Sequence, residues 1–428
     1  MRVRFLSLGC RVNQYEAQAL EGLFSQNGFT VVLDGEADVF VINSCTVTSA
    51  ADHKSRQAVR RVRREHPGAV VVLTGCLPQA APDAARALPE ADIVTGSLDR
   101  AGLVGKVQRF LQDGERRISI PAFSPGEAFE PLEIGRFDES FQRAYLKVED
   151  GCDRFCSYCA IPLARGPVRS RPPGEITAEV RRLVFAGYRE IVLTGINLSR
   201  YGSGWGSSLA EAAAACEKVP GDFRIRLGSV EPDLLSPADW DALAAFPRLC
   251  PQFHLALQSG CDATLRRMNR HYTARQYLET VEGIRRRFSN PSVTTDLIAG
   301  FPGETEAEFA ETLAFVEKVG FARIHAFPYS RRAGTVADRM PDQVDEGVKH
   351  MRTNQLSSLG NKLEERFVKG LIGSVQSVLF ERAEGDGLAE GYTGQYVRVR
   401  AQAQPNSIHS VRIVRTEGAL AFGEIVDI

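Results

Sequence analysis

Three cysteines in the middle of the chain have the residue type and spacing for iron–sulfur chemistry. Cys152, Cys156 and Cys159 follow one another at intervals of four and three residues. Thiolates so spaced fit a compact loop around one iron–sulfur cluster. A four-iron cluster needs four ligands, and three cysteines leave one iron without a protein ligand. That iron could bind an exogenous ligand, just as the open coordination position of a catalytic zinc ion does. A zinc knuckle or three core cysteines are the alternatives, although no histidine lies nearby to complete a zinc site.

Three further cysteines, Cys10, Cys45 and Cys76, each follow a different short apolar segment. These β-rich segments are Val3–Leu8, Val39–Asn43 and Val70–Thr74. Helix-favouring segments alternate with them, at Tyr15–Phe24, Asp52–Arg64, Pro82–Leu88 and Asp99–Leu111. The alternation predicts a parallel sheet with crossover helices, in which the carboxyl ends of the strands share one ligand-binding edge. We therefore expect the three cysteines to converge and to hold a second cluster with an open iron. Coincidence among buried cysteines is the alternative.

The same alternation resumes at Phe141 and continues through the central part of the chain. The predicted strands are Ala144–Val148, Ile191–Thr194, Arg224–Gly228, His254–Leu257, Val293–Ile298 and Arg323–Phe327. The predicted helices are Ile176–Ala186, Leu209–Glu217, Ala274–Arg286 and Glu306–Val319. Six strands with intervening helices predict an α/β barrel, complete or partial, whose active site lies at the carboxyl ends of the strands.

Polar or small residues stand where these central strands end, as a ligand-binding rim requires. The candidates are Gly195, Asn197, Ser229, Glu231, Gln258 and Asp296, together with Tyr158 between two of the cysteines. A glycine at position 195 would let the backbone approach a ligand closely. Taken singly, each of these residues could instead be a helix cap, a turn residue or a packing residue.

The remaining segments divide the chain into units. Residues 114–141 carry several prolines and glycines, which predicts an extended connector. A long polar helix is predicted at Asp342–Phe367. After it, short β-rich runs predict a small antiparallel β-barrel, at Ser374–Phe380, Tyr396–Ala401 and Val411–Val414. We expect an N-terminal parallel-sheet α/β domain at 1–115, a linker at 116–140, a partial (β/α) barrel at 141–366 and the small barrel at 367–428.

The composition bounds the classes of protein that remain. Of 428 residues, 52 are basic and 53 acidic, so the net charge of -1 excludes a polybasic protein but permits a local basic face. No apolar run approaches the roughly 18 residues of a membrane helix, and the N-terminus does not resemble a signal peptide. We therefore expect a cytoplasmic protein with no membrane partner. In a reducing compartment its nine cysteines are expected to be metal ligands, catalytic groups or core residues rather than disulfides.

The Cys-x3-Cys-x2-Cys pattern closely resembles the signature of the radical S-adenosylmethionine (SAM) superfamily. The resemblance implies that Cys152, Cys156 and Cys159 are the catalytic ligands of a [4Fe–4S] cluster and that SAM binds the open iron. It also implies that the cluster donates an electron that cleaves SAM to a 5′-deoxyadenosyl radical. The rim residues would then contact SAM, with Gly195 and Asn197 beside its methionine part and Tyr158 near its adenine.

The order of the units resembles one family within that superfamily, the methylthiotransferases, over essentially the whole chain. The small barrel, with Gly391-Tyr-Thr-Gly-Gln-Tyr396, is similar to their TRAM domain. The resemblance implies an auxiliary [4Fe–4S] cluster on Cys10, Cys45 and Cys76 and the transfer of a methylthio group to an unactivated C–H carbon. Two SAM molecules would be used per turnover, one for the methyl group and one for the radical. It implies an electron donor such as flavodoxin or ferredoxin and leaves the sulfur donor open.

The stretch Leu8-Gly-Cys-Arg-Val-Asn-Gln-Tyr-Glu16 resembles the MtaB-type branch, in which lysine stands at the place of Arg11. That branch implies tRNA as the partner, with N6-threonylcarbamoyladenosine at position 37 methylthiolated at C2. The alternatives within the family are a RimO-type enzyme acting on a ribosomal-protein aspartate and a MiaB-type enzyme acting on isopentenyladenosine. From another class, the alternative is a non-catalytic iron–sulfur protein that binds RNA or senses redox state.

Basic residues gather where they could meet RNA phosphates. One group lies on a predicted helix: Lys54, Arg56, Arg60, Arg61, Arg63 and Arg64. A second group adjoins the rim and is the stronger candidate: Arg165, Arg169, Arg171, Arg331 and Arg332. The small barrel has six basic and seven acidic residues from Lys369 onward, which slightly favours the RimO-type alternative and leaves Arg398 and Arg400 as its candidates. Of the other cysteines, Cys216 and Cys250 are expected to be structural, and Cys261 is given no role.

Overall fold

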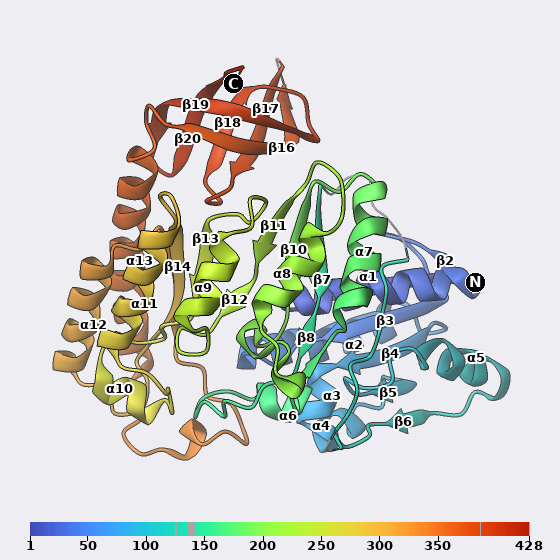
Figure 1. Cartoon of the computed structure of the whole chain (residues 1–428). Helices are drawn as coiled ribbons and strands as arrows, with labels where there is room; N and C mark the ends of the chain where they lie inside the picture. The colour runs from blue at the N-terminus through green and yellow to red at the C-terminus, as the bar shows by residue number, and fades with distance from the viewer. Residues whose placement is uncertain (125, 136–141, 386, 428) are drawn as a thin grey trace.

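The computed structural model describes residues 1–124, 126–135, 142–385 and 387–427. The chain forms three units, drawn in Figure 1 in blue, in green to orange, and in red. The predicted start of the central domain at Phe141 lies outside the described residues.

Among the described residues, the N-terminal unit is a six-stranded parallel sheet in the order β2-β1-β3-β4-β5-β6. Strands β3 and β4 are buried along their whole length, because a parallel sheet covered on both faces leaves no side for water. The strands are β1 (Arg2–Ser7), β2 (Thr30–Val31), β3 (Val39–Ser44), β4 (Val70–Gly75), β5 (Ile93–Thr95) and β6 (Arg117–Ser119). The helices are α1 (Arg11–Gln26), α2 (Ser49–Glu65), α3 (Cys76–Ala80), α4 (Pro82–Arg86) and α5 (Leu103–Asp113).

The central unit is a partial barrel made of two parallel sheets, β11-β10-β7 and β12-β13-β14-β15. A single parallel bridge from Ile225 to Leu249 lies between them. The strands are β7 (Arg143–Lys147), β10 (Glu190–Thr194), β11 (Arg224–Leu227), β12 (Ser229–Val230), β13 (Gln252–Leu255), β14 (Ser292–Ala299) and β15 (Arg323–Pro328). The hairpin β8 (Glu149–Asp150) and β9 (Arg169–Ser170) flanks the cysteine loop.

The helices of the central unit cover the outside of these sheets (Figure 1). They are α6 (Ile161–Arg165), α7 (Pro173–Phe185), α8 (Leu209–Glu217), α9 (Pro237–Ala244), α10 (Asp262–Arg267), α11 (Ala274–Arg287) and α12 (Glu306–Val319), with 3-10 turns η1 (Leu198–Arg200), η2 (Ser203–Trp205) and η3 (Ala337–Arg339). The strand residues that face the helices, such as Leu146, Leu193 and Phe253, form one buried hydrophobic core. Because successive side chains of a strand point to opposite faces, the residues between these core residues face the interior of the barrel.

The long helix α13 (Glu346–Lys369) leads to a closed five-stranded barrel in the order β16-β17-β18-β20-β19. Its strands are β16 (Val375–Gly385), β17 (Leu388–Thr393), β18 (Arg398–Gln402), β19 (Ser407–Glu417) and β20 (Leu420–Ile425). The predicted barrel is confirmed, with one difference in pairing. Strands β18 and β20 run parallel to each other, whereas the other pairs are antiparallel.

The small barrel docks on the starting ends of the central strands through a buried charge cluster. Glu190, at the start of β10, accepts hydrogen bonds from Arg224 Nε at 2.5 Å and Arg226 Nε at 2.9 Å, and Arg143 Nε lies 3.1 Å away. These arginines also reach the turn after β17, where the Arg226 guanidinium donates to the carbonyl of Gly394 at 2.8 Å. Although burial opposes it, the three guanidiniums hold the pKa of Glu190 well below its ordinary value.

The alternating pattern predicted the large elements well, since each predicted strand and helix of the first two units overlaps an observed one. Several details differ, and the short strands β2, β5 and β12 and the short helices α3 and α6 were not predicted. Helix α5 begins at Leu103 rather than Asp99, and the predicted connector contains β6, which pairs with β5 at the sheet edge. Helices α9 and α10 were not predicted, because eight and six residues are too few to show a clear helical period. Within the described residues, no helix is long and apolar enough to cross a membrane.

Candidate functional site

The three N-terminal cysteines stand at the carboxyl ends of neighbouring strands, as predicted. Cys10 precedes α1 after β1, Cys45 follows β3, and Cys76 begins α3 after β4. The backbone turns sharply before two of them, with φ of +102° at Gly9 and +100° at Gly75, which glycine adopts without strain. A Cβ on Gly9 would lie 2.6 Å from Cys45 Sγ, so only glycine lets these two loops approach each other.

The thiol groups of this first set influence one another electrostatically. Burial raises the pKa of Cys76 to about 11, and the charges of Cys10 and Cys45 add to the shift. Asn13 fixes the loops around the set, because its Nδ2 donates to the carbonyls of Leu8 at 2.7 Å and Ser44 at 2.9 Å. The sheet edge therefore brings the three sulfurs into one neighbourhood.

The central cysteines lie in the loop between β8 and α6, at the carboxyl end of β7. Side-chain donors from two other loops reach two of them. Arg270 Nη1 donates to Cys156 Sγ at 3.2 Å, and Asn197 Nδ2 lies 3.8 Å from Cys152 Sγ. Burial raises the pKa of Cys152 to about 11 and that of Cys159 to about 12. Neighbouring cysteines of the same loop raise both pKa values further.

Arg165 connects the two cysteine sets. It is the last residue of α6, six positions after Cys159, and is fully buried. Its Nε donates to Cys76 Sγ at 3.1 Å in the N-terminal unit, and its Nη2 donates to Asn13 Oδ1 at 2.6 Å. Its Nη1 also donates to Glu16 Oε1 at 2.6 Å. Arg165 thus links α6, the helix that follows the central cysteine loop, to the sheet edge of the N-terminal unit. In Figure 1, α6 lies beside α3.

Glu16 is the anionic centre of this junction. Arg100 Nη2 lies 3.0 Å from one of its oxygens, and Lys147 Nζ donates to the other at 2.8 Å. Burial alone would raise the pKa of Glu16, but Arg100, Arg165 and Lys147 lower it to about 2. The carboxylate is therefore ionised at neutral pH and holds cations from both units against the sheet edge.

Several predicted rim residues gather around the second cysteine set. The backbone N–H of Asn197 donates to Glu149 Oε2 at 2.7 Å, while Asn197 Oδ1 and Glu149 Oε1 are buried with no hydrogen-bond partner among the described residues. A Cβ on Gly195 would lie 2.7 Å from Glu149 Oε2, so this glycine makes room for the carboxyl group. Burial raises the pKa of Glu149 well above its ordinary value, against the opposing hydrogen bond from Asn197.

Other rim residues are placed less directly against the cysteines. Glu231 pairs with Arg270, the residue that donates to Cys156. Asp296 lies 3.4 Å from His254 Nε2 on the neighbouring strand. Ser229 is exposed at the start of β12. Gln258 has a φ of +69° and forms a parallel bridge to Leu297 of β14. Tyr158 is half-buried and packs edge-on against Phe301. Contacts of these residues with SAM stay a prediction.

The donor sets are suited to clusters rather than to single ions. Among the residues that the structure describes, no group of three or more His, Cys, Asp or Glu side chains is arranged to hold one metal ion. A cluster makes a different demand, since each cysteine binds a different iron. Each set supplies three thiols on one loop or edge, together with a guanidinium N–H aimed at a sulfur. These features fit an iron–sulfur cluster at each place, and the two unpartnered oxygens of Asn197 and Glu149 leave polar groups free for a ligand at the second.

Four of the five arginines that were the stronger candidates for phosphate contacts are buried in ion pairs, so that interpretation was wrong for them. Arg165 is held by Glu16, Arg169 by Asp150, Arg171 by Glu179, and Arg332 by Asp52. Sequence cannot distinguish a rim cation from a buried one when the partner carboxylate comes from another segment. Arg331 is exposed and pairs with Asp338.

Both candidate arginines of the small barrel also pair with carboxylates there. Arg398 lies 3.9 Å from Glu390, and Arg400 contacts Glu384 and Glu390 at 3.1 and 3.0 Å. The remaining cysteines, Cys216, Cys250 and Cys261, are buried.

Sequence reasoning missed the residues that support the cysteines. Arg165 was assigned to RNA, and no role was given to Asn13, Glu16, Glu149 or Arg270. Glu149 had a local signal, because it directly precedes the cysteine motif. Arg270 had none, since it comes from a loop more than a hundred residues after the cysteine that it contacts.

Comparison with known families assigns the first two units. The profile of the radical SAM superfamily matches residues 146–316, and that of the uncharacterized protein family UPF0004 matches residues 2–96. Among solved structures, the radical SAM methyltransferase TsrM from Kitasatospora setae superposes with a TM-score of 0.57 at 13% identity, covering 79% of this chain and 74% of that one. At this identity the likeness concerns the fold alone.

Similar proteins extend over nearly the full length. The threonylcarbamoyladenosine tRNA methylthiotransferase MtaB of Thermotoga maritima is 39% identical, covering 96% of this chain and 94% of that protein. MtaB of Bacillus subtilis is 37% identical, covering 93% and 89%. The tRNA-2-methylthio-N(6)-dimethylallyladenosine synthase of Carboxydothermus hydrogenoformans is 34% identical, covering 87% and 86%.

Proposed function

The chain belongs to the radical SAM methylthiotransferase family, and we propose that it attaches a methylthio group to C2 of N6-threonylcarbamoyladenosine at position 37 of tRNA. The observation that carries the substrate is likeness over almost the whole length to enzymes named for that nucleoside, at 39% and 37% identity. A relative named for dimethylallyladenosine is 34% identical over a smaller share of the chain. The stretch from Leu8 to Glu16 supports the same choice, with Arg11 retaining the charge of the family's lysine.

Members of the superfamily use a [4Fe–4S] cluster and SAM, and we place that cluster on Cys152, Cys156 and Cys159. When bound, the cluster supplies the electron that cleaves SAM, and SAM supplies the radical and the methyl group. We place a second [4Fe–4S] cluster on Cys10, Cys45 and Cys76 as the site through which sulfur reaches the product. Its support is the convergence of these cysteines at one sheet edge and the donor that Arg165 aims at Cys76 Sγ.

The protein's own residues prepare both places for this chemistry. Arg270 donates to Cys156 Sγ and pairs with Glu231, so its positive charge would stabilise negative charge on a cluster held there. Glu149 turns the loop of Asn197 toward Cys152 through the Asn197 N–H. We propose that the free Asn197 Oδ1 accepts a hydrogen bond from the amino group of SAM, because it is buried beside Cys152 without a partner.

Arg165 holds the second loop against the sheet edge, which fixes the distance between the two cysteine sets. Such rigidity matters because a radical formed at one set must act on a carbon that the other set can reach. We propose that the other rim residues, Gly195, Ser229, Glu231, Gln258, Asp296 and Tyr158, line the SAM site between them. The partners proposed are tRNA and a small electron-transfer protein such as flavodoxin or ferredoxin.

The test is mass spectrometry of tRNA nucleosides from cells that lack this protein and from complemented cells. We expect 2-methylthio-N6-threonylcarbamoyladenosine to disappear in the deletion strain and its precursor without the methylthio group, N6-threonylcarbamoyladenosine, to accumulate. A loss of 2-methylthio-isopentenyladenosine instead would assign the MiaB-type substrate. Unchanged tRNA together with an unmodified ribosomal-protein aspartate would assign the RimO-type substrate.

A further inference from the structure

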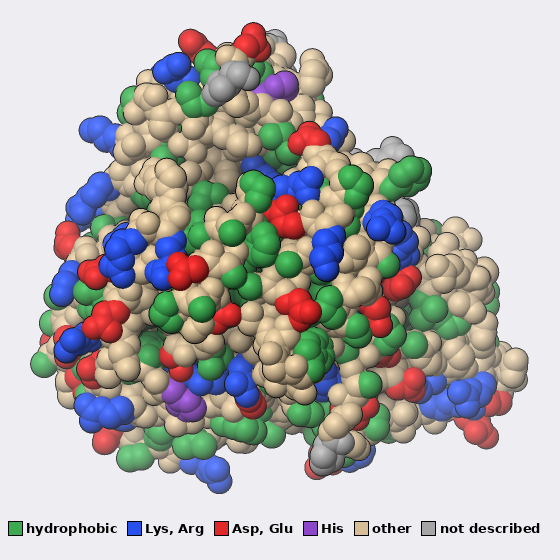
Figure 2. All heavy atoms as spheres, viewed as in Figure 1, with side chains coloured by type: hydrophobic (Ala, Val, Ile, Leu, Met, Phe, Trp, Pro, Cys, Tyr) green, Lys and Arg blue, Asp and Glu red, His purple; other side chains and the backbone are tan. Residues whose placement is uncertain are grey.

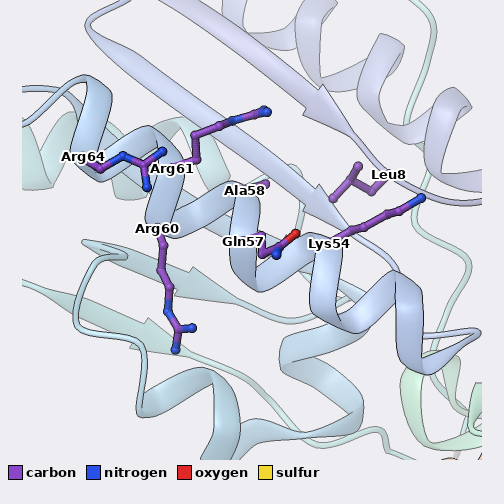
Figure 3. A pocket seen from close by; sticks show the side chains of 7 residues that line it. All are labelled: Leu8, Lys54, Gln57, Ala58, Arg60, Arg61 and Arg64. Atoms are coloured by element: carbon purple, nitrogen blue, oxygen red, sulfur yellow. The ribbon is translucent and has the colours of Figure 1, made fainter.

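A basic groove lies along α2, beside the N-terminal cysteine set and outside the cluster sites. It has a cavity volume of about 500 Å³ and is lined by Leu8, Lys54, Gln57, Ala58, Arg60, Arg61 and Arg64. Figure 3 shows Lys54 and Arg61 extending from the helix toward the side of Leu8, whereas Arg60 extends from the other side. None of the described residues that line the groove is acidic.

The cations of the groove differ in how far their charge is neutralised. Arg60 lies 3.5 Å from Glu90 and Arg64 lies 3.3 Å from Glu65, and both pairs are open to solvent. In the part of the chain that the structure describes, Lys54 and Arg61 have no ion-pair partner, and both are exposed. By contrast, the neighbouring Arg63 is committed to the fold, with its guanidinium 2.5 Å from Asp92 and bonded to three backbone carbonyls.

Three of the exposed cations are spaced so that they lie on one helix face. Lys54, Arg61 and Arg64 stand at positions separated by seven and three residues, which places them on the same side of α2. Ten residues of helix from Lys54 to Arg64 rise by about 15 Å, so the row is long enough to follow several successive phosphates of a nucleic-acid strand. Elsewhere, on the face shown in Figure 2, basic and acidic side chains are intermingled, so such a row does not stand out there.

One end of the groove lies close in sequence to the N-terminal cysteine set. Leu8, which lines it, is two residues from Cys10, and Cys10 is exposed at the same sheet edge. A strand that lies in the groove therefore passes beside the place where we put the auxiliary cluster. The positive charge of its lining attracts anionic partners, and a row of cations along a helix fits the repeating charges of a polyanion.

We propose that this groove binds the phosphate backbone of the tRNA substrate next to the modified nucleoside. The inference rests on the proposed function, and it assigns the RNA contact to α2 of the N-terminal unit rather than to the small barrel. Lys54 and Arg61 are the principal contacts, because neither has an ion-pair partner among the described residues, and Arg64 extends the row. Leu8 sets the end of the groove beside Cys10.

The experiment measures binding of an undermodified tRNA transcript to the full-length protein carrying Lys54→Glu and Arg61→Glu together. Two lost contacts and two reversed charges should weaken binding about tenfold or more at 0.1 M salt, and should lower the slope of log affinity against log salt by about 1.8. The matched control reverses two exposed lysines on α12 and α13, Lys318→Glu and Lys362→Glu, which change the net charge by the same amount. The control should keep the affinity and slope of the parent.

The neutral variant Lys54→Gln with Arg61→Gln guards against misfolding and should give a smaller loss of the same sign, at an unchanged melting temperature. If the charge-reversed protein binds tRNA as tightly as the control, the groove is not the RNA site. If tRNA affinity is unchanged but reduction by flavodoxin slows, the groove serves an acidic electron donor and the inference is overturned. Failure of the proposed function is seen separately, because the parent protein would then leave N6-threonylcarbamoyladenosine in tRNA without a methylthio group.

Discussion

Replacing Arg165 by methionine tests the junction between the two cysteine sets. Methionine keeps most of the side-chain volume but removes the donors to Glu16, Asn13 and Cys76 Sγ. Removing one partner of a buried ion pair costs about 3–5 kcal/mol. Since Glu16 retains Lys147 at 2.8 Å and Arg100 at 3.0 Å, we expect the lower end, about 3 kcal/mol.

The assay is thermal unfolding of the metal-free protein under anaerobic, reducing conditions. A loss of about 3 kcal/mol should lower the first unfolding midpoint by about 6 °C or more in a unit of this size. Arg165→Lys keeps the charge but not the planar fork, so its midpoint should lie between those of the parent and the methionine variant. The control is Arg275→Met, which breaks an exposed pair with Glu279 and should leave the midpoint unchanged. A methionine variant that melts within about 1 °C of the parent would refute the stabilising role of this junction.

Two further predictions follow from the cysteines and from the docking of the small barrel. The Cys45→Ser variant should lose the iron of one cluster and keep that of the other. The control variant Cys216→Ser, at a buried cysteine of α8, should keep both clusters. Iron analysis and electron paramagnetic resonance measure the number of clusters in each variant. Glu190, whose pKa is lowered in the folded protein, stabilises the fold above its ordinary pKa of about 4.5, and that contribution is lost as the pH falls through the folded value. Glu190→Gln should therefore be less stable at pH 7, with a midpoint that varies less than the parent's below pH about 4.5; equal pH slopes would argue against it.

The sequence predicted the parts of the site that are local. Cysteines after apolar runs, and the strand–helix alternation around them, were enough to place both cysteine sets at strand ends. Cys10, Cys45 and Cys76 converge because parallel strands end at one edge, which is a general property of the topology.

The residues that support the cysteines depend on contacts between distant segments and could not be predicted. Arg165 and Arg332 were given to RNA, whereas each pairs with a carboxylate at least 149 positions away in the sequence. Local patterns carry no information on such partners. For the same reason, the sequence ranked Lys54 and Arg61 as weaker candidates for phosphate contacts, although the structure shows them exposed and without an ion-pair partner among the described residues.

The central claim is that this chain methylthiolates N6-threonylcarbamoyladenosine in tRNA. The most direct measurement incubates the anaerobically reconstituted protein with SAM, a strong reductant, a sulfide source and tRNA that carries this nucleoside, and then analyses the digested tRNA by mass spectrometry. We predict formation of the 2-methylthio nucleoside together with 5′-deoxyadenosine, and no modification of tRNA carrying isopentenyladenosine. Production of 5′-deoxyadenosine with the threonylcarbamoyl nucleoside left unmodified, by protein that holds both clusters, would contradict the account.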